Sequence, residues 1–408
     1  MHVPRALLDS AGGGGLGSAR KETNMSAPLV PQDGLLLGRA RVPGYSYPRL
    51  VTVRNGRVLD ITAPGLATSR DICERPDAAA YVAGATGTDL GAVEAVLAAS
   101  WADKVSDSAP SLLSPIDLQA VKAAGVTFVV SLLERVIEEQ ARGDKARAEA
   151  LRGEITGLIG TDLSKLVPGS DTAMKVKQTL IARGVWSQYL EVGIGPDAEI
   201  FTKSQPMSTV GFGADVGILP ISEWNNPEPE VALVVASSGR IVGATLGNDV
   251  NLRDVEGRSA LLLGKAKDNN ASASLGPFIR LFDAGFTLDD IKSAEVALEV
   301  KGEDGFVLDG HSSMRQISRT PDSLVASAIG RHHQYPDGFV LYLGTMFAPV
   351  KDRGGAGKGF THKGNDIVTI STPTLGALAN RVRLSTECPP WTYGASHLMR
   401  DLAKAGLL

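Results

Sequence analysis

Cysteine and histidine are both scarce in this chain. Its 408 residues include two cysteines and six histidines. Two cysteines cannot build a disulfide framework, and they are too few for a cysteine-based zinc site. We therefore expect a protein of a reducing compartment, the cytoplasm.

The chain also lacks an excess of positive charge and a long apolar run. Its formal net charge is −4, with acidic and basic residues interspersed. Binding of a polyanion needs a cationic surface, so we predict no nucleic-acid partner and no membrane partner. The longest apolar stretch, residues 126–133, is far shorter than the roughly 20 residues that span a bilayer. The composition is ordinary for a globular protein with a large core.

The first part of the chain divides into a leader and a small domain. Residues 1–33 include a glycine-rich stretch without the apolar core of a secretory signal, and we expect this leader to be disordered. Residues 34–110 are expected to form a small N-terminal β domain. Its clearest element is a hairpin of strands 49–54 and 57–62, joined by Asn55-Gly56, a pair typical of tight hairpin turns.

The remaining residues, 111–408, are expected to form the catalytic domain. A helical excursion at about 132–190, rich in Glu, Arg, Ala and Lys, opens this domain. The chain then continues in β-rich runs, such as the hairpin of residues 231–236 and 241–246. The sequence thus predicts a β-rich α+β fold with mixed sheets, a small N-terminal domain and a helical insertion.

Three carboxylates are placed to meet beside this second hairpin. Glu228 and Glu230 lie two residues apart at the start of a strand, so their side chains share one face. Asp249 follows the return strand and can come beside them. Converging carboxylates repel one another unless a hard cation lies between them, and such oxygen ligands suit Mg²⁺, with Mn²⁺ or Ca²⁺ as alternatives. A solvated acidic edge is the competing interpretation, and it is the commoner one for an isolated Glu-x-Glu.

The order of motifs around these residues resembles the fumarylacetoacetate hydrolase superfamily. The resemblance covers roughly residues 191–386. Its motifs are Glu228-Pro-Glu230, Gly247-Asn-Asp-Val-Asn-Leu-Arg-Asp254, Leu263-Gly-Lys265, Gly344-Thr-Met346 and Gly364-Asn-Asp-Ile367. The resemblance implies that family's fold of mixed and rolled β-sheets, a 2-oxo acid substrate, and assembly into a homodimer or a larger homo-oligomer.

The resemblance also assigns roles by position. The implied metal ligands are the three carboxylates Glu228, Glu230 and Asp249. Lys265 matches a lysine that adds positive charge beside the enolate or donates a proton to it. Lys203, Arg253 and Thr345 are the implied substrate-binding residues. Arg253 is flanked by acids, so it has the alternative role of orienting the groups around the metal.

One segment departs from the hydrolytic members of that family. Those members use a His–Glu pair to activate the attacking water, but the matching histidine position here holds Arg135, with Glu138 three residues further on. Arginine stays protonated and cannot act as a general base. No histidine occurs between His2 and His311. A reaction that needs the enolate but no attacking water is β-elimination.

The sequence therefore favours a metal-dependent lyase that dehydrates a 2-keto-3-deoxy sugar acid. One branch of the superfamily converts such pentonates to a dioxo acid such as 2-oxoglutarate semialdehyde, and its long helical excursion is similar to the one here. Glu138 is the candidate acid or base, against the alternative of a solvated helix carboxylate. Two further functions stay open: a hydrolase that cleaves a C–C bond of a 2,4-dioxo acid, and a binding protein that kept the fold without turnover.

Overall fold

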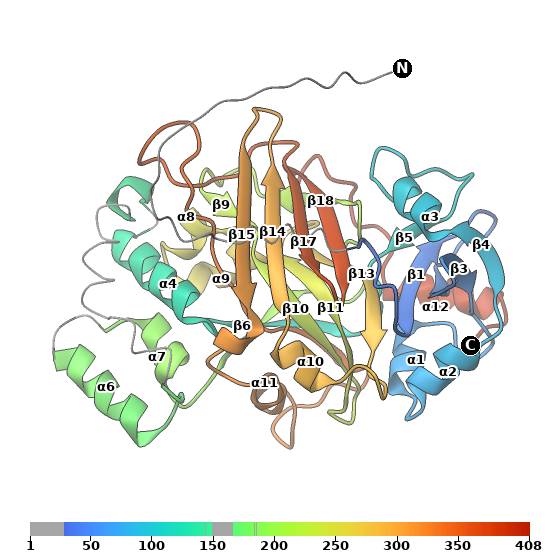
Figure 1. Ribbon diagram of the computed structural model, residues 1–408, viewed down its shortest axis with the longest axis horizontal. Helices are drawn as coiled ribbons and strands as arrows, with labels where there is room; N and C mark the ends of the chain where they lie inside the picture. Colours follow the sequence, from blue (N-terminus) through green and yellow to red (C-terminus); the bar gives the residue numbers. More distant parts are fainter. Residues whose placement is uncertain (1–27, 143, 149–165, 183, 185) are drawn as a thin grey trace, which may run out of the picture.

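The computed structural model describes residues 28–142, 144–148, 166–182, 184 and 186–408. The expected disorder of the leader, up to residue 27, lies outside these residues. Figure 1 shows a central body of long strands, with a helical unit at one end and a small β unit at the other.

In the described part of the chain, eleven strands form one large sheet. Their order is β4-β3-β2-β1-β13-β11-β10-β16-β6-β7, with β5 paired to β1. In chain order they are β1 (Leu36–Arg41), β2 (Arg49–Arg54), β3 (Arg57–Asp60), β4 (Thr88–Ala92), β5 (Ser111–Leu113), β6 (Ala120–Gly125), β7 (Glu199–Ser204), β10 (Pro229–Val235), β11 (Ile241–Asp249), β13 (Ala273–Leu281) and β16 (Phe339–Tyr342).

A second sheet packs on the first, and a short strand pair lies beside them. The strands of the second sheet are β8 (Asp215–Ile218), β14 (Glu295–Lys301), β15 (Val307–Ser313), β17 (Ile367–Thr372) and β18 (Gly376–Leu384). The short pair is β9 (Asn225–Asn226) with β12 (Asn251–Leu252). Buried residues from both large sheets, such as Leu233 and Leu298, share one apolar core. The body is therefore a pair of packed sheets, as the α+β expectation requires.

Both predicted hairpins are confirmed. Strands β2 and β3 pair antiparallel through Asn55 and Gly56, which have φ angles of 49° and 71°. Two successive positive φ angles are what a tight two-residue hairpin turn needs. Strands β10 and β11 also pair antiparallel, and they extend past the predicted ends to Pro229 and Asp249. That extension brings the predicted acidic residues to the end of the hairpin.

The helical excursion has its own apolar core. Its described helices are α4 (Val129–Ala141), α6 (Asp171–Ala182) and α7 (Gln188–Ile194). Buried side chains from all three helices, including Val136, Leu180 and Leu190, pack together. This unit stands at one end of the sheets in Figure 1, and it contacts the rest of the protein through α4, where Arg135 reaches Glu228, and through α7, where Arg319 donates to the Val192 carbonyl.

The small N-terminal unit is continuous with the main sheet. Strand β1 pairs with β13 through Leu36–Arg280 and Leu37–Ile279. This unit also holds the helices α1 (Ser69–Glu74), α2 (Ala78–Gly84) and α3 (Val93–Ala99). The C-terminal helix α12 (Ala395–Lys404) lies with the same unit in Figure 1, where Leu398 and Leu402 pack on Ala67. The C-terminal helix therefore packs against the N-terminal unit at one end of the molecule.

The other helices are short and connect strands. They are α8 (Arg253–Glu256), α9 (Leu263–Lys267), α10 (Leu288–Lys292) and α11 (Pro321–Ala328). Every described helix is too short or too polar to cross a membrane. Helices α8 and α9 follow β12 directly, so they lie beside the acidic end of the β10–β11 hairpin.

Candidate metal centre

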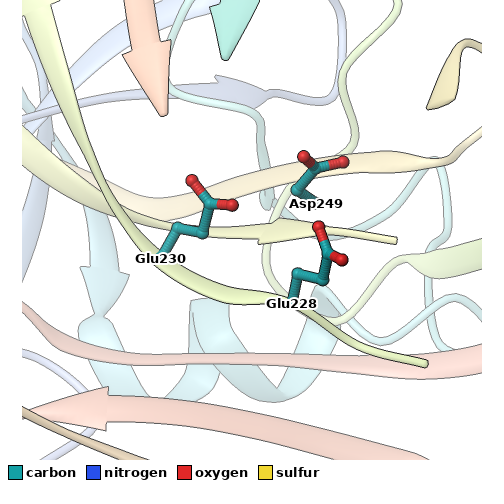
Figure 2. A group of neighbouring side chains, drawn as sticks. All are labelled: Glu228, Glu230 and Asp249. Carbon is teal, nitrogen blue, oxygen red and sulfur yellow. The ribbon is translucent and has the colours of Figure 1, made fainter. Parts of the chain in front are cut away.

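Three carboxylates meet where strand β10 begins and strand β11 ends. Glu228, Glu230 and Asp249 each offer an oxygen, and these oxygens lie within 4.8 Å of one another. Each residue is about 1% exposed. Figure 2 shows the three side chains turned toward one another from two neighbouring strands. The carboxylates of the predicted triad are therefore together and buried.

The strand register explains this arrangement. The Asp249 amide donates to the Glu228 carbonyl over 3.1 Å, which places these two residues opposite each other. Glu230 is two residues further along, so its side chain returns to the same face. Its partner on β11 is Gly247, which has no side chain. The ring of Tyr342 fills the space beside this glycine, and the shared strand face directs the Glu230 carboxylate toward the other two.

Two buried lysines neutralise part of this charge. Lys203, on β7, lies 2.7 Å from Asp249 (Nζ to Oδ1), and it also donates to the carbonyls of Val250 and Lys267. Lys267, on α9, lies 2.5 Å from Glu228 Oε2 and 3.1 Å from Asp249 Oδ2. Burial acts against ionisation, but Lys267 and Arg135 lower the pKa of Glu228 to about 2. Burial lowers the pKa of Lys203, although Asp249 opposes the effect.

Glu230 has no such cationic partner among the described residues. Its carboxylate accepts hydrogen bonds from the Gly344 amide over 2.7 Å and from the Thr345 hydroxyl over 3.4 Å. Burial, together with the neighbouring Asp249 and Glu228, raises the pKa of Glu230 well above its ordinary value. The triad thus combines a hard, all-oxygen ligand set with negative charge that the protein does not fully neutralise. These residues fit a divalent cation such as Mg²⁺.

The helical unit contributes an arginine to the same centre. Arg135, on α4, forms an ion pair with Glu228 Oε1. Its Nη1 atom lies 2.7 Å from Glu138 Oε2 and 3.2 Å from Glu256 Oε2. Despite burial, these carboxylates raise the pKa of Arg135 well above its ordinary value. Arg135, which was predicted to stand at the position of the hydrolytic histidine, is therefore permanently charged.

Glu138 lies between this arginine and a second one, Arg253. Glu138 is 1% exposed, and its two oxygens face Arg135 and Arg253. Burial raises its pKa, although both arginines oppose the effect. Arg253 donates to the side-chain oxygen of Asn226 and to the carbonyl of Pro349. The contacts of Arg253 agree with its alternative role, which is to orient neighbouring groups. Glu138 is an ion-pair partner of Arg135.

The predicted lysine is corrected from Lys265 to Lys267. Lys265 is exposed on α9, whereas Lys267 is 3% exposed and contacts the triad. Two residues on a helix are separated by about 200° of rotation, so only one of the two side chains can face the carboxylates. The burial of Lys267 beside the exposed Lys265 shows which side of α9 packs inward. Spacing from Leu-Gly alone could not reveal that side.

A further carboxylate, which the sequence analysis did not select, lines the site. Glu199, on β7, lines a small polar cavity together with Glu228, Asp249 and Lys267. Burial and the nearby Glu256 raise the pKa of Glu199 to about 7, although Lys267 opposes them. A signal was present: Glu199 lies four residues before Lys203, and strand alternation puts both on one face.

The glycine opposite Glu199 makes room for this carboxylate. Gly125 pairs with Glu199 between β6 and β7. A Cβ atom added to Gly125 would lie 1.9 Å from Glu199 Oε2. Thr345 lines the same cavity, whereas Lys203 and Arg253 do not. Of the three predicted substrate-binding residues, only Thr345 borders this cavity.

Comparison with known proteins agrees with this centre. Residues 191–383 match the family model described as fumarylacetoacetate (FAA) hydrolase C-terminal. The match covers somewhat less than half of the chain. All three carboxylates, both lysines and Thr345 lie inside it, whereas Arg135 and Glu138 lie before it. The family segment therefore supplies the triad, and the helical excursion adds the arginine.

Two curated relatives are similar over part of their length. The chain is 32% identical over 188 residues to a 2-dehydro-3-deoxy-D-arabinonate dehydratase of Saccharolobus solfataricus, which covers 45% of this chain and 58% of that protein. It is 31% identical over 194 residues to a probable 2-keto-3-deoxyxylonate dehydratase of Haloferax volcanii, covering 48% and 63%. The chain thus spans about three fifths of the length of the curated relatives it matches.

Solved structures share the fold over a larger part of the chain. A 2-keto-3-deoxy-D-arabinonate dehydratase in its apo form has a TM-score of 0.58 at 22% identity. The same enzyme complexed with magnesium and 2,5-dioxopentanoate has a TM-score of 0.57 at 22% identity. Each covers 86% of this chain and 99% of its own. The expected α+β fold of this family is confirmed.

Proposed function

We propose that this chain is a magnesium-dependent dehydratase of 2-keto-3-deoxy pentonates, which forms a dioxo acid such as 2-oxoglutarate semialdehyde. The observation that carries the proposal is the place of Arg135. It stands beside the carboxylate triad, clamped by Glu138 and Glu256, where a hydrolase would need a base to activate water. Both curated relatives are named as dehydratases of such acids.

The triad is the proposed magnesium site. Glu228, Glu230 and Asp249 would hold the ion, and Lys203 would keep Asp249 oriented from behind. A bound Mg²⁺ would supply a Lewis acid that polarises the 2-oxo group and stabilises an enolate. Lys267 adds a second positive charge beside the same groups, and the Thr345 hydroxyl offers a donor for the substrate carboxylate.

Glu199 is the proposed proton carrier. The reaction removes a proton from C3 and the hydroxyl group from C4, which leaves with a proton as water. The unsaturated 2-oxo acid that remains rearranges to the dioxo acid. A carboxyl group with a pKa of about 7 can both accept and donate a proton near neutral pH, and Glu199 borders the cavity. In this proposal Glu138 positions Arg135 and does not transfer the proton.

The hydrolase alternative has weaker support. Among the described residues that line the cavity there is no histidine. Cleavage of a 2,4-dioxo acid would need another group to activate water, and Glu199 is the nearest candidate. The binding-protein alternative would leave the buried triad and Lys267 without a chemical role.

One experiment separates the three functions. The protein is incubated with Mg²⁺ and either a 2-keto-3-deoxy pentonate or an acylpyruvate, and the products are identified by mass spectrometry. The proposal expects the semialdehyde from the pentonate and no pyruvate from the acylpyruvate. Pyruvate without semialdehyde would establish the hydrolase, and Mg²⁺ binding without either product would favour the binding protein. A Glu199→Gln variant should keep Mg²⁺ binding but lose most of the semialdehyde formation.

The cytoplasmic location and the homo-oligomeric state stay predictions. Light scattering of the purified protein would test the second, because a homodimer has twice the 42.7 kDa mass of the chain.

A further inference from the structure

Both carboxylate oxygens of Glu228 are already engaged by protein cations. Arg135 contacts Oε1, and Lys267 lies 2.5 Å from Oε2. All three side chains are buried, with no more than 6% exposed. An ion that binds Glu228 must therefore compete with at least one of these two cations for an oxygen.

Among the described residues, Arg135 has an ion-pair partner outside the triad, Glu256, whereas both ion-pair partners of Lys267 belong to the triad. The Nη1 atom of Arg135 already lies 3.2 Å from Glu256 Oε2. That Oε2 atom is buried and accepts no hydrogen bond from the described residues. The second carboxylate near Lys267 is Asp249, itself a member of the triad. Arg135 can thus leave Glu228 for an acceptor outside the triad that it already approaches, whereas both carboxylates within ion-pair distance of Lys267 belong to the triad.

We propose that Arg135 is an exchangeable counter-ion of the metal centre. It neutralises Glu228 in the metal-free protein and transfers to Glu256 when a divalent ion binds, so the balance between these two carboxylates sets the metal affinity. This inference rests on the metal site of the proposed function. It adds that the helical unit tunes this site through a single side chain from α4.

The physical argument is a competition between charges. A guanidinium in contact with a metal ligand repels the incoming ion and occupies its oxygen, so it weakens binding. Glu256 works in the opposite direction, because it stabilises the state in which the arginine has moved away. Groups beside metal ligands commonly change metal affinity by about 10- to 100-fold. The two residues should therefore shift the affinity in opposite senses.

The test measures Mg²⁺ binding by isothermal titration calorimetry in four proteins. Arg135→Gln should bind Mg²⁺ about tenfold more tightly than the wild type, and Glu256→Gln about tenfold more weakly. The double variant should bind like Arg135→Gln, because Glu256 acts only through the arginine. Arg142→Gln, at the exposed end of α4, is the matched control for loss of one positive charge and should bind like the wild type.

The outcomes separate this inference from the proposed function. A wild type that does not bind Mg²⁺ overturns both. A wild type that binds Mg²⁺, with Arg135→Gln unchanged or weaker, overturns the exchange alone. The exchange is also overturned if Glu256→Gln weakens Mg²⁺ binding in the Arg135→Gln protein as much as it does in the wild type. If Arg135→Gln does not fold, Glu256→Gln still decides, because tighter or unchanged binding there contradicts the exchange.

Discussion

The centre has two halves that are built in different ways. In the sheet half, Glu199, Lys203 and the carboxylate triad lie on or beside β7, β10 and β11. In the helical half, Arg135 and Glu138 on α4, Glu256 on α8 and Lys267 on α9 reach the same point. The backbone register fixes the sheet half. The helical half depends on long side chains whose direction follows from helix rotation.

The halves also differ in charge. The sheet half brings three carboxylates together, and burial with the neighbouring Asp249 and Glu228 raises the pKa of Glu230. The helical half delivers two cations, Arg135 and Lys267, to the most negative point of the site. We conclude that the sheet half defines where a cation binds, and that the helical half adjusts how strongly it binds and what reaction it supports.

The largest expected effect is at the lysine of the helical half. Lys267→Met removes the cation that contacts Glu228 and Asp249, so kcat/KM should fall about 100- to 1,000-fold. Lys265→Met, two residues away on the exposed side of α9, should stay within about twofold of the wild type. Steady-state kinetics with saturating Mg²⁺ measure both. An equal loss in the two variants would restore Lys265 to the site.

The next effect separates stability from metal binding in the sheet half. Glu230→Gln keeps an oxygen that accepts from the Gly344 amide, and its NH₂ group can donate to the Thr345 hydroxyl, but it removes a carboxylate whose ionisation the neighbours disfavour. Because the pKa of Glu230 is raised in the fold, its ionisation makes the metal-free protein less stable as the pH rises above about 4–5. The variant should therefore raise the Tm of the metal-free protein at neutral pH.

The same variant should bind Mg²⁺ at least about 100-fold more weakly, because it loses a direct ligand. Differential scanning fluorimetry, with and without Mg²⁺, measures both effects. The Tm difference between wild type and variant should reverse its sign when Mg²⁺ is added. A lower Tm of the metal-free variant, with unchanged Mg²⁺ binding, would remove Glu230 from the metal site.

How much the sequence could predict follows the same division. Strand alternation and the hairpin signal placed Glu228, Glu230 and Asp249 together, because a two-residue period leaves no choice of face. Helix rotation has no such simple rule for a five-residue segment, so Lys265 was selected where Lys267 is buried.

The contacts of Arg135 could not be predicted at all. Arg135 and Glu228 are 93 residues apart in the chain, and only the packing of α4 brings them together. The small N-terminal domain was expected, but its attachment to α12 was not. That contact joins segments far apart in the chain, and nothing in the local sequence of either segment specifies the other.

A smaller effect tests how precisely the strands of the sheet half position the Glu199 carboxyl group. Gly125→Ala places a Cβ atom 1.9 Å from Glu199 Oε2, so the carboxyl group must move while the strand can stay. A displacement of about 1 Å at a reacting group can cost about 10- to 100-fold in rate, and we expect kcat to fall by at least tenfold. Gly264→Ala, on α9 in the helical half, is the control, since its added Cβ meets nothing within 4 Å. Wild-type kcat in Gly125→Ala would contradict the proton-carrier role of Glu199.

The smallest effect is expected for a residue outside both halves, where a substitution should change stability but not the metal centre. Thr68 caps helix α1 in the N-terminal unit: its hydroxyl accepts from the Asp71 amide, and the Asp71 side chain accepts from the Thr68 amide. Thr68→Ala should cost about 1 kcal/mol of stability and leave kcat/KM and Mg²⁺ affinity unchanged. Chemical denaturation and calorimetry measure these quantities. A change in Mg²⁺ affinity would mean that the N-terminal unit is coupled to the metal centre. The sheet half and the helical half alone would then not explain the properties of that centre.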